Sequence, residues 1–172
     1  MKKWSFAFAL LLIAGAVFGE ETGRKNYITN GDFADGKNGW ILHYCRFEDG
    51  QVVFNHQEVL YTQLWQVVKA TPPAGSKVAM EIVAKVTDPE GLLKEKSAFT
   101  RIMVIFRNAE KKEISLPSEK GLALRLDDTN GEYKTFTRVY TVPEGVVEIW
   151  PLTIVKDPVR VEVKSVRLWQ LD

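Results

Sequence analysis

Aromatic and hydrogen-bonding side chains alternate along residues 58–69, at the two-residue spacing that places them on one face of a β-strand. Tyr61, Gln63 and Trp65 share this face. Flat rings beside an amide suit a sugar, because a sugar has apolar C–H faces and a rim of hydroxyls. The opposite face mixes polar and apolar side chains too, so alternation alone leaves open which face is buried.

A second set of such residues lies along residues 146–155. Val147 and Ile149 form an all-apolar pair on one face, which predicts that they are buried and that Glu148 and Trp150 point outward. Trp150 would then stack on a sugar ring, while Glu148 accepts hydrogen bonds from its hydroxyls.

Arg101 adds a donor from a third segment, residues 98–107. It shares one face of that segment with Arg107, opposite a set of apolar residues, Ile102, Val104 and Phe106. These guanidinium groups could donate hydrogen bonds to ligand oxygens. The alternative is that they are simply solvated arginines on the surface of a sheet.

The elements that position these residues are strands, because the apolar residues downstream of Trp40 recur with period two and long helical stripes are absent. Turn sequences rich in Gly, Pro and Asp separate the segments. The predicted strands are 39–47, 51–56, 58–69, 77–87, 98–107, 133–142, 146–155 and 159–170. Residues 108–132 are expected to hold a short strand with long loops. The pattern predicts an all-β fold, an antiparallel β-sandwich.

Several single residues have structural interpretations. Phe33 and Trp40 are predicted core residues, and Trp169 is assigned to the core or an edge. Cys45 is the only cysteine, so the chain has no internal disulfide, and it is interpreted as a small buried hydrophobe. Asp127 and Asp128 precede Asn130-Gly131 and are interpreted as turn formers.

The first 19 residues are predicted to be a signal peptide. Lys2 and Lys3 precede an apolar stretch that ends before Glu20, which is too short for a comfortable membrane span. Residues 20–172 then form a single domain, exported to the periplasm or secreted. Removing the two lysines leaves 21 basic residues against 22 acidic ones. This near-neutral balance argues against nucleic acid as a partner.

Catalytic and metal-binding motifs are missing from the sequence. His43 and His56 are its only histidines and lack metal-ligand spacing. No nucleophile elbow, phosphate loop or dinucleotide fingerprint is present. We therefore expect a non-catalytic protein without a metal or a cofactor.

Three motifs carry a family resemblance. The chain opens with Asn30-Gly31-Asp32-Phe33 followed by Gly39-Trp40, contains Leu64-Trp65-Gln66 ahead of a Pro/Gly turn, and closes with an aromatic strand ending in Val142-Pro143-Glu144-Gly145. In this order they resemble secreted carbohydrate-binding modules of the galactose-binding-like jelly-roll superfamily. The resemblance implies a jelly-roll β-sandwich. It also implies that Tyr61, Gln63 and Trp65 face a concave sheet surface, where several related modules bind glycans.

The resemblance has one departure. Many related modules hold a structural calcium ion with carboxylates at two places that align here with Ala34 and Lys164. A missing carboxylate and an added ammonium oppose calcium binding, so we predict that this site is absent. The resemblance implies binding of a poly- or oligosaccharide by aromatic stacking. The alternative is a structural or protein-interaction sandwich without sugar binding.

Overall fold

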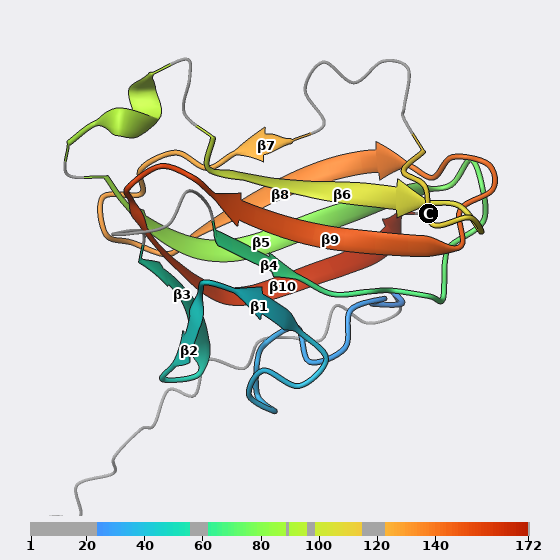
Figure 1. Cartoon of the computed structure of the whole chain (residues 1–172), viewed down its shortest axis with the longest axis horizontal. Coiled ribbons are helices and arrows are strands. Elements are labelled where there is room, and N and C mark those ends of the chain that lie inside the picture. Colours follow the sequence, from blue (N-terminus) through green and yellow to red (C-terminus); the bar gives the residue numbers. More distant parts are fainter. Residues whose placement is uncertain (1–23, 56–61, 89, 96–98, 115–122, 172) are drawn as a thin grey trace, which may run out of the picture.

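Two five-stranded antiparallel sheets pack face to face in the computed structural model, which describes residues 24–55, 62–88, 90–95, 99–114 and 123–171 (Figure 1). The first sheet has the order β1-β4-β9-β6-β7, comprising Ile41–His43, Thr62–Trp65, Glu148–Val155, Arg101–Arg107 and Leu124–Arg125. The second sheet has the order β2-β3-β10-β5-β8, comprising Arg46–Glu48, Gln51–Asn55, Arg160–Leu171, Lys77–Thr87 and Lys134–Thr141. The predicted antiparallel β-sandwich is confirmed.

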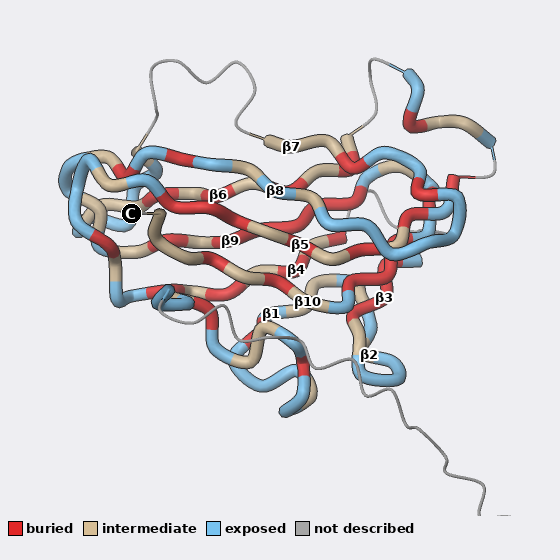
Figure 2. Tube along the Cα trace, turned by 180° about the vertical axis from the view of Figure 1, so that it is seen from behind, coloured by how far each residue is buried: buried red, intermediate tan, exposed pale blue. Residues whose placement is uncertain are grey.

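The core lies between the sheets, because each long strand turns alternate apolar residues inward. In β5, Val78, Met80 and Ile82 are fully buried, and β10 pairs along the whole of β5 with a bulge between Val163 and Ser165. Buried residues accordingly follow the middle of the strands while the connecting loops are exposed (Figure 2). The long strand predicted at residues 77–87 coincides with β5.

The strand predicted at residues 39–47 is wrong as a single element. Tyr44 has a φ of 55°, in the left-handed region, and the chain there crosses from one sheet to the other. β1 before it pairs with β4, and β2 after it pairs with β3. Cys45 lies at this crossover, where its thiol donates to the Gln63 carbonyl at 3.1 Å. Cys45 is half-buried, so it is less enclosed than the sequence interpretation of a buried hydrophobe. Burial raises the pKa of its thiol to about 12, which opposes reactivity.

The opening loop packs into the sandwich, as its two aromatic residues predicted. Phe33 and Trp40 are buried with ring centroids 5.5 Å apart, and the Trp40 indole donates to the Asn30 carbonyl at 2.9 Å. Gly31 accepts a 2.7 Å hydrogen bond from the Val166 amide. A Cβ at Gly31 would lie 2.2 Å from the Val166 carbonyl oxygen, so only glycine permits this close approach to β10.

Smaller features of the chain also differ from the sequence predictions or refine them. Val147 was predicted to be buried but is 42% exposed, because β9 begins one residue later at Glu148. A 3-10 helix occupies Leu92–Lys94, and β7 is the short strand expected within residues 108–132. Asp128 accepts a hydrogen bond from the Asn130 amide at 3.1 Å, as a turn former does. Within the described ranges, the chain forms no helix long and apolar enough to cross a membrane.

Candidate binding face

The outer face of the first sheet gathers the sequence-predicted residues that the structure describes. On β6 the inward side chains are buried, whereas Arg101, Met103, Ile105 and Arg107 are half-buried and point outward. The same alternation on β4 buries Leu64 at 1% exposure and leaves its neighbour Trp65 half-buried on the outside. Alternate residues of a strand leave opposite faces of the sheet, so Trp65 belongs to the outer face and not to the core.

Strand register arranges these outward residues in two neighbouring rows that run across the strands. The Gln63 row contains Cα partners from all five strands, His43, Gln63, Ile154, Arg101 and Arg125. The Trp65 row lies two residues further along each strand and contains Ile41, Trp65, Leu152 and Met103. With neighbouring strands about 4.8 Å apart, the Gln63 row is about 19 Å long.

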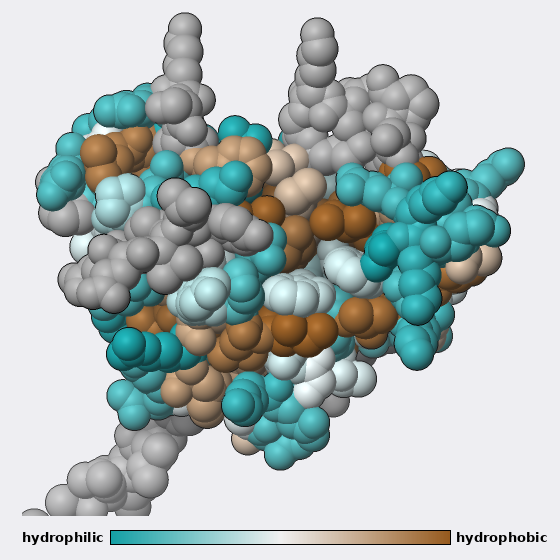
Figure 3. Space-filling model, viewed as in Figure 1, coloured by the Kyte–Doolittle hydropathy of each residue, from teal (hydrophilic) through white to brown (hydrophobic). Residues whose placement is uncertain are grey.

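The centre of this face is apolar. Leu152 and Ile154 point outward from β9, yet they are only 6% and 8% exposed. Ile41 at the edge of the Trp65 row is 43% exposed. In the space-filling view, apolar residues accordingly gather across the middle of the face and hydrophilic residues flank them (Figure 3).

Trp65 and Trp150 are both half-buried on this face, but their rings have different neighbours. The register partners of Trp65 are Ile41 and Leu152, and no aromatic ring or cation of the described residues is stacked on it. Its half-buried indole thus offers a flat apolar surface beside the Gln63 amide, which lies two residues away on the same face of β4.

Trp150 is held by its neighbours. The Arg107 guanidinium carbon lies 4.2 Å from the centre of the Trp150 ring, and the indole N–H donates to Glu148 Oε2 at 3.2 Å. Arg107 and Glu148 are also Cα partners across β6 and β9. One ring face of Trp150 is therefore already covered by a cation, and the Glu148 carboxylate is engaged by Trp150.

The structure describes five of the six site residues that the sequence predicted. Gln63, Trp65, Arg101, Glu148 and Trp150 all lie on the outer face of the first sheet, although they come from three strands. Tyr61 lies outside the described residues. Sequence reasoning did not include the apolar centre of the face or the partners at its ends, namely Met103, Ile105, Leu152, Ile154, Ile41, His43 and Arg125. Period-two alternation from Arg101 and Trp150 would have found most of them, but Arg125 stands on a two-residue strand without a pattern.

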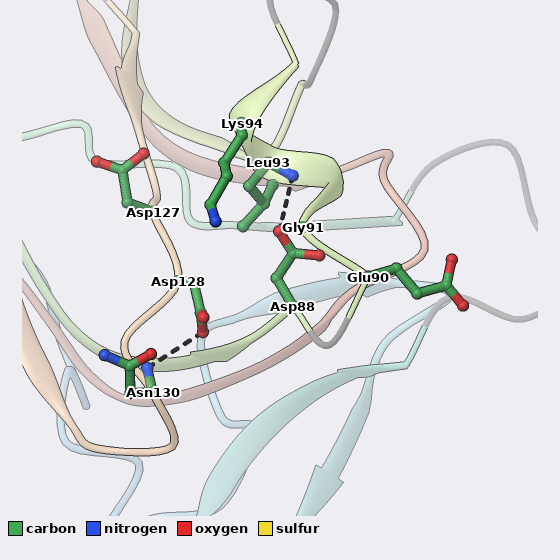
Figure 4. Close-up of a pocket in the computed structure, with 8 residues that line it drawn as sticks. All are labelled: Asp88, Glu90, Gly91, Leu93, Lys94, Asp127, Asp128 and Asn130. Atoms are coloured by element: carbon green, nitrogen blue, oxygen red, sulfur yellow. Dashed lines mark hydrogen bonds between the residues drawn. The ribbon is translucent and has the colours of Figure 1, made fainter.

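A cleft of about 580 Å³ lies elsewhere, where the 3-10 helix meets the turn before β8 (Figure 4). Asp88 is buried there, and its carboxylate accepts hydrogen bonds from the Leu92 and Leu93 amides at 2.9 and 2.8 Å. Lys94 points into the cleft. Asp88 thus stabilises the start of the helix, which is a structural use of its charge.

The residues at the calcium positions do not fit that ion. Ala34 has no ligand atom in its side chain, and the Lys164 ammonium lies 5.7 Å from the centre of the Tyr133 ring. In the opening loop, Asp32 accepts a hydrogen bond from the Ala34 amide and Asp35 accepts one from the Asn38 side chain. In the part of the chain that the structure describes, no three His, Cys, Asp or Glu side chains group to hold a metal. The absence of calcium stays a prediction.

No known protein family and no curated protein matches the sequence. Solved structures do match. The CBM22-1 xylan-binding domain of Paenibacillus barcinonensis Xyn10C superposes with a TM-score of 0.56 at 9% identity, covering 87% of this chain and 96% of that domain. TmCBM61 in complex with β-1,4-galactotriose superposes with a TM-score of 0.54 at 14% identity, covering 86% of this chain and 99% of that module.

The enzymatically active domain of bacteriophage CBA120 tailspike protein 4 also matches, with a TM-score of 0.63 at 11% identity and 85% of this chain covered. The chain spans only 21% of that structure's length. At these identities the likeness establishes the fold. This protein has the jelly-roll β-sandwich fold of carbohydrate-binding modules, and the predicted resemblance is confirmed at that level.

Proposed function

We propose that the outer face of the first sheet binds a poly- or oligosaccharide, with sugar rings stacked on Trp65 and hydroxyls bonded to Gln63 and its row. The observation that carries the proposal is Trp65 itself, a half-buried ring without a stacking partner among the described residues, beside an apolar strip and an amide. An apolar flat surface with a few fixed polar groups is the usual composition of a sugar site.

The comparisons support the class of ligand. Structures with this fold include a xylan-binding domain and a module in complex with β-1,4-galactotriose. Fold alone does not establish function, so the proposal rests on the residues of the outer face and extends to sugars as a class.

The proposed function is binding without catalysis. Glycoside hydrolysis ordinarily requires two carboxyl groups flanking the scissile bond. Among the described strands of the first sheet, Glu148 is the one carboxylate on the outer face, and it is bonded to Trp150. The outer face therefore supplies aromatic and hydrogen-bonding contacts without a pair of acids.

A glycan array with the wild-type protein and Trp65→Ala tests this function. We expect the variant to lose roughly tenfold or more in affinity for the retained glycan, because truncating an aromatic anchor removes most of its contact. Trp169→Ala is the matched control, since Trp169 is a half-buried tryptophan of the second sheet. Equal losses in both variants would contradict the proposal, and retention only by a protein partner would support a protein-interaction sandwich instead.

Trp150→Ala should have a smaller effect on binding than Trp65→Ala. Arg107 already covers one face of the Trp150 ring, so a sugar stacked on that face must first displace the guanidinium. Measuring both variants on the same glycan ranks the two rings. A larger loss for Trp150→Ala would show that the bound glycan displaces Arg107.

We further propose that residues 1–19 direct export and are removed. Amino-terminal sequencing of the protein recovered outside the cytoplasm tests this directly. A mature chain that begins near Glu20 is the expected result, and an intact amino terminus would contradict it.

A further inference from the structure

Two arginines end the Gln63 row. Arg101 on β6 and Arg125 on β7 are direct Cα partners in an antiparallel pair, and both side chains project outward from the outer face. Like charges directly opposite each other destabilise a sheet. An anion bound between the two guanidinium groups would remove this repulsion.

The described residues around this pair provide little compensation for its charge. Nε and Nη2 of Arg125 are buried and donate no hydrogen bond in the described part of the molecule. The nearby Asp127 carboxylate is 4.0 Å from Nε, on a side chain that is 81% exposed. Such an exposed pair at the limit of contact contributes little. Among the described residues, Arg125 thus has two donors without an acceptor, on a side chain that is 30% exposed.

Arg101 also lacks a carboxylate partner among the described residues. Its guanidinium carbon lies 4.1 Å from the centre of the Phe99 ring. No ion pair joins Arg101 to Asp157 within the described residues, where Asp157 Oδ2 accepts hydrogen bonds from the Phe99 amide and the Thr100 hydroxyl, both at 2.7 Å. The Phe99 ring fixes the guanidinium without satisfying its charge.

The charge balance of the whole face points the same way. On the described strands of the first sheet, the outer face holds Arg101, Arg107 and Arg125 against Glu148. Glu148 is the register partner of Arg107, so no carboxylate on the described strands of this face lies opposite Arg101 or Arg125. A planar guanidinium matches the oxygens of a carboxylate or a sulfate bidentately.

We propose that the glycan on this face is acidic, and that Arg101 and Arg125 bind a uronate carboxylate or a sulfate ester on it. This inference rests on the function proposed above. Trp65 on β4 lies two strands across and two residues along the sheet from Arg101 on β6, a Cα separation of about 12 Å. When one sugar unit stacks on Trp65, the charged substituent at the arginine pair would therefore belong to another sugar unit of the same glycan.

The test is a panel in which each polysaccharide backbone is present in a neutral and an anionic form. Polygalacturonate and its methyl ester form the carboxylate arm, and a sulfated galactan and its desulfated form make the sulfate arm. We expect the anionic member of one arm to bind at least about tenfold more tightly, because hydrogen bonds between charged groups are the strong ones. This preference should shrink as salt is raised from about 0.05 to about 0.5 M.

The double variant Arg101→Gln/Arg125→Gln should lose the preference for the anionic form and keep residual binding that depends on Trp65. Arg46→Gln is the matched single-charge control, because Arg46 is exposed on β2 of the second sheet. Unfolding midpoints of all variants exclude loss of fold as the cause.

The possible outcomes separate the inference from the function on which it rests. Binding that depends on Trp65 but is equal for neutral and anionic forms leaves the proposed function standing and overturns the inference. Equal retention of duplex DNA and of acidic glycan, unchanged by Trp65→Ala, identifies unspecific anion binding and also overturns it. If no glycan is retained, the proposed function fails and the inference fails with it.

Discussion

The outer faces of the two sheets differ in how their charged side chains are paired. On the second sheet, Glu162 of β10 is 6% exposed, and its carboxylate contacts Lys85 Nζ at 2.6 Å and Arg160 Nε at 2.8 Å. Gln51 donates to the same carboxylate at 3.2 Å, and the Tyr133 hydroxyl bonds to both Gln51 and Glu162. Around Glu162 this face therefore satisfies its charged groups internally, although the Trp169 indole N–H on the same face has no hydrogen-bond partner among the described residues. Figure 2 views the molecule from this side.

On the first sheet, by contrast, two arginines face each other, and Nε and Nη2 of Arg125 have no hydrogen-bond partner among the described residues. The fold alone does not require this arrangement, since the second sheet has the same number of strands and pairs its charges around Glu162. A face with unpaired charged donors is therefore a better candidate for a ligand than a face whose charges are paired. Four predictions test this difference.

Truncation of neighbouring residues on β4 should produce the largest difference in stability. Leu64→Ala should lower the free energy of unfolding by about 2–5 kcal/mol, because Leu64 is 1% exposed in the core. Trp65→Ala should cost about 1–2 kcal/mol or less, because its ring is half-buried on the outer face. Urea unfolding compares the two variants. Equal losses would place Trp65 in the core.

Glu162→Gln should destabilise the protein by about 1–3 kcal/mol at neutral pH, because it weakens hydrogen bonds between charged groups on the second sheet. Burial acts to raise the pKa of Glu162, but the hydrogen bonds from Arg160 and Lys85 outweigh it, and the pKa lies below its ordinary value of 4.5. A carboxyl group with a lowered pKa stabilises the fold above pH 4.5, and this contribution is lost as pH falls through the folded-state pKa.

The difference in stability between wild type and Glu162→Gln should accordingly narrow in acid. Urea unfolding at neutral pH and below pH 4 measures it. A difference that stays constant over this range would mean that the Glu162 charge does not contribute to stability.

Arg125→Gln should change stability in the opposite direction to Glu162→Gln. Removing one of two opposed arginines should raise the free energy of unfolding by about 0.2–1 kcal/mol in the absence of ligand. Thermal and urea unfolding check the sign, with Arg46→Gln as the control. A destabilised variant would show that Arg125 serves the fold, as Glu162 does on the other sheet.

Calcium should have no effect on the stability of the protein. Ala34 and Lys164 offer no carboxylate at the two expected positions, and a ligand stabilises a protein only by binding its folded state. The melting temperature should therefore be the same with chelator and with about millimolar calcium. A rise of several degrees on adding calcium would contradict this prediction.

Local patterns in the sequence predicted much of the fold, because alternation of apolar residues indicates strands, and Gly, Pro and Asp indicate turns. The strand at residues 77–87 and the core positions of Phe33 and Trp40 are examples. Alternation also separated Ile149 from Trp150 on β9. It failed at residues 39–47, because the pattern continues through Tyr44 while the backbone changes sheets there.

The composition of the site was less predictable, because pairing between distant strands decides it. No pattern within one segment relates Arg101 to Arg125, which only the register of β6 and β7 brings together. The stacking of Arg107 on Trp150 likewise joins two strands that are far apart in the sequence. Trp65 could not be assigned from its own strand, since both faces of that segment mix polar and apolar residues.

The longest free edge of the sandwich has a consequence for assembly. β8 is the outermost strand of the second sheet, and Arg138 in its middle is the Cα partner of Met80, which points into the core. A charged side chain on the inward side of an edge strand opposes the addition of a further strand from another molecule. If the proposed glycan binding crowds copies along a polymer, this edge would resist growth into a continuous intermolecular sheet.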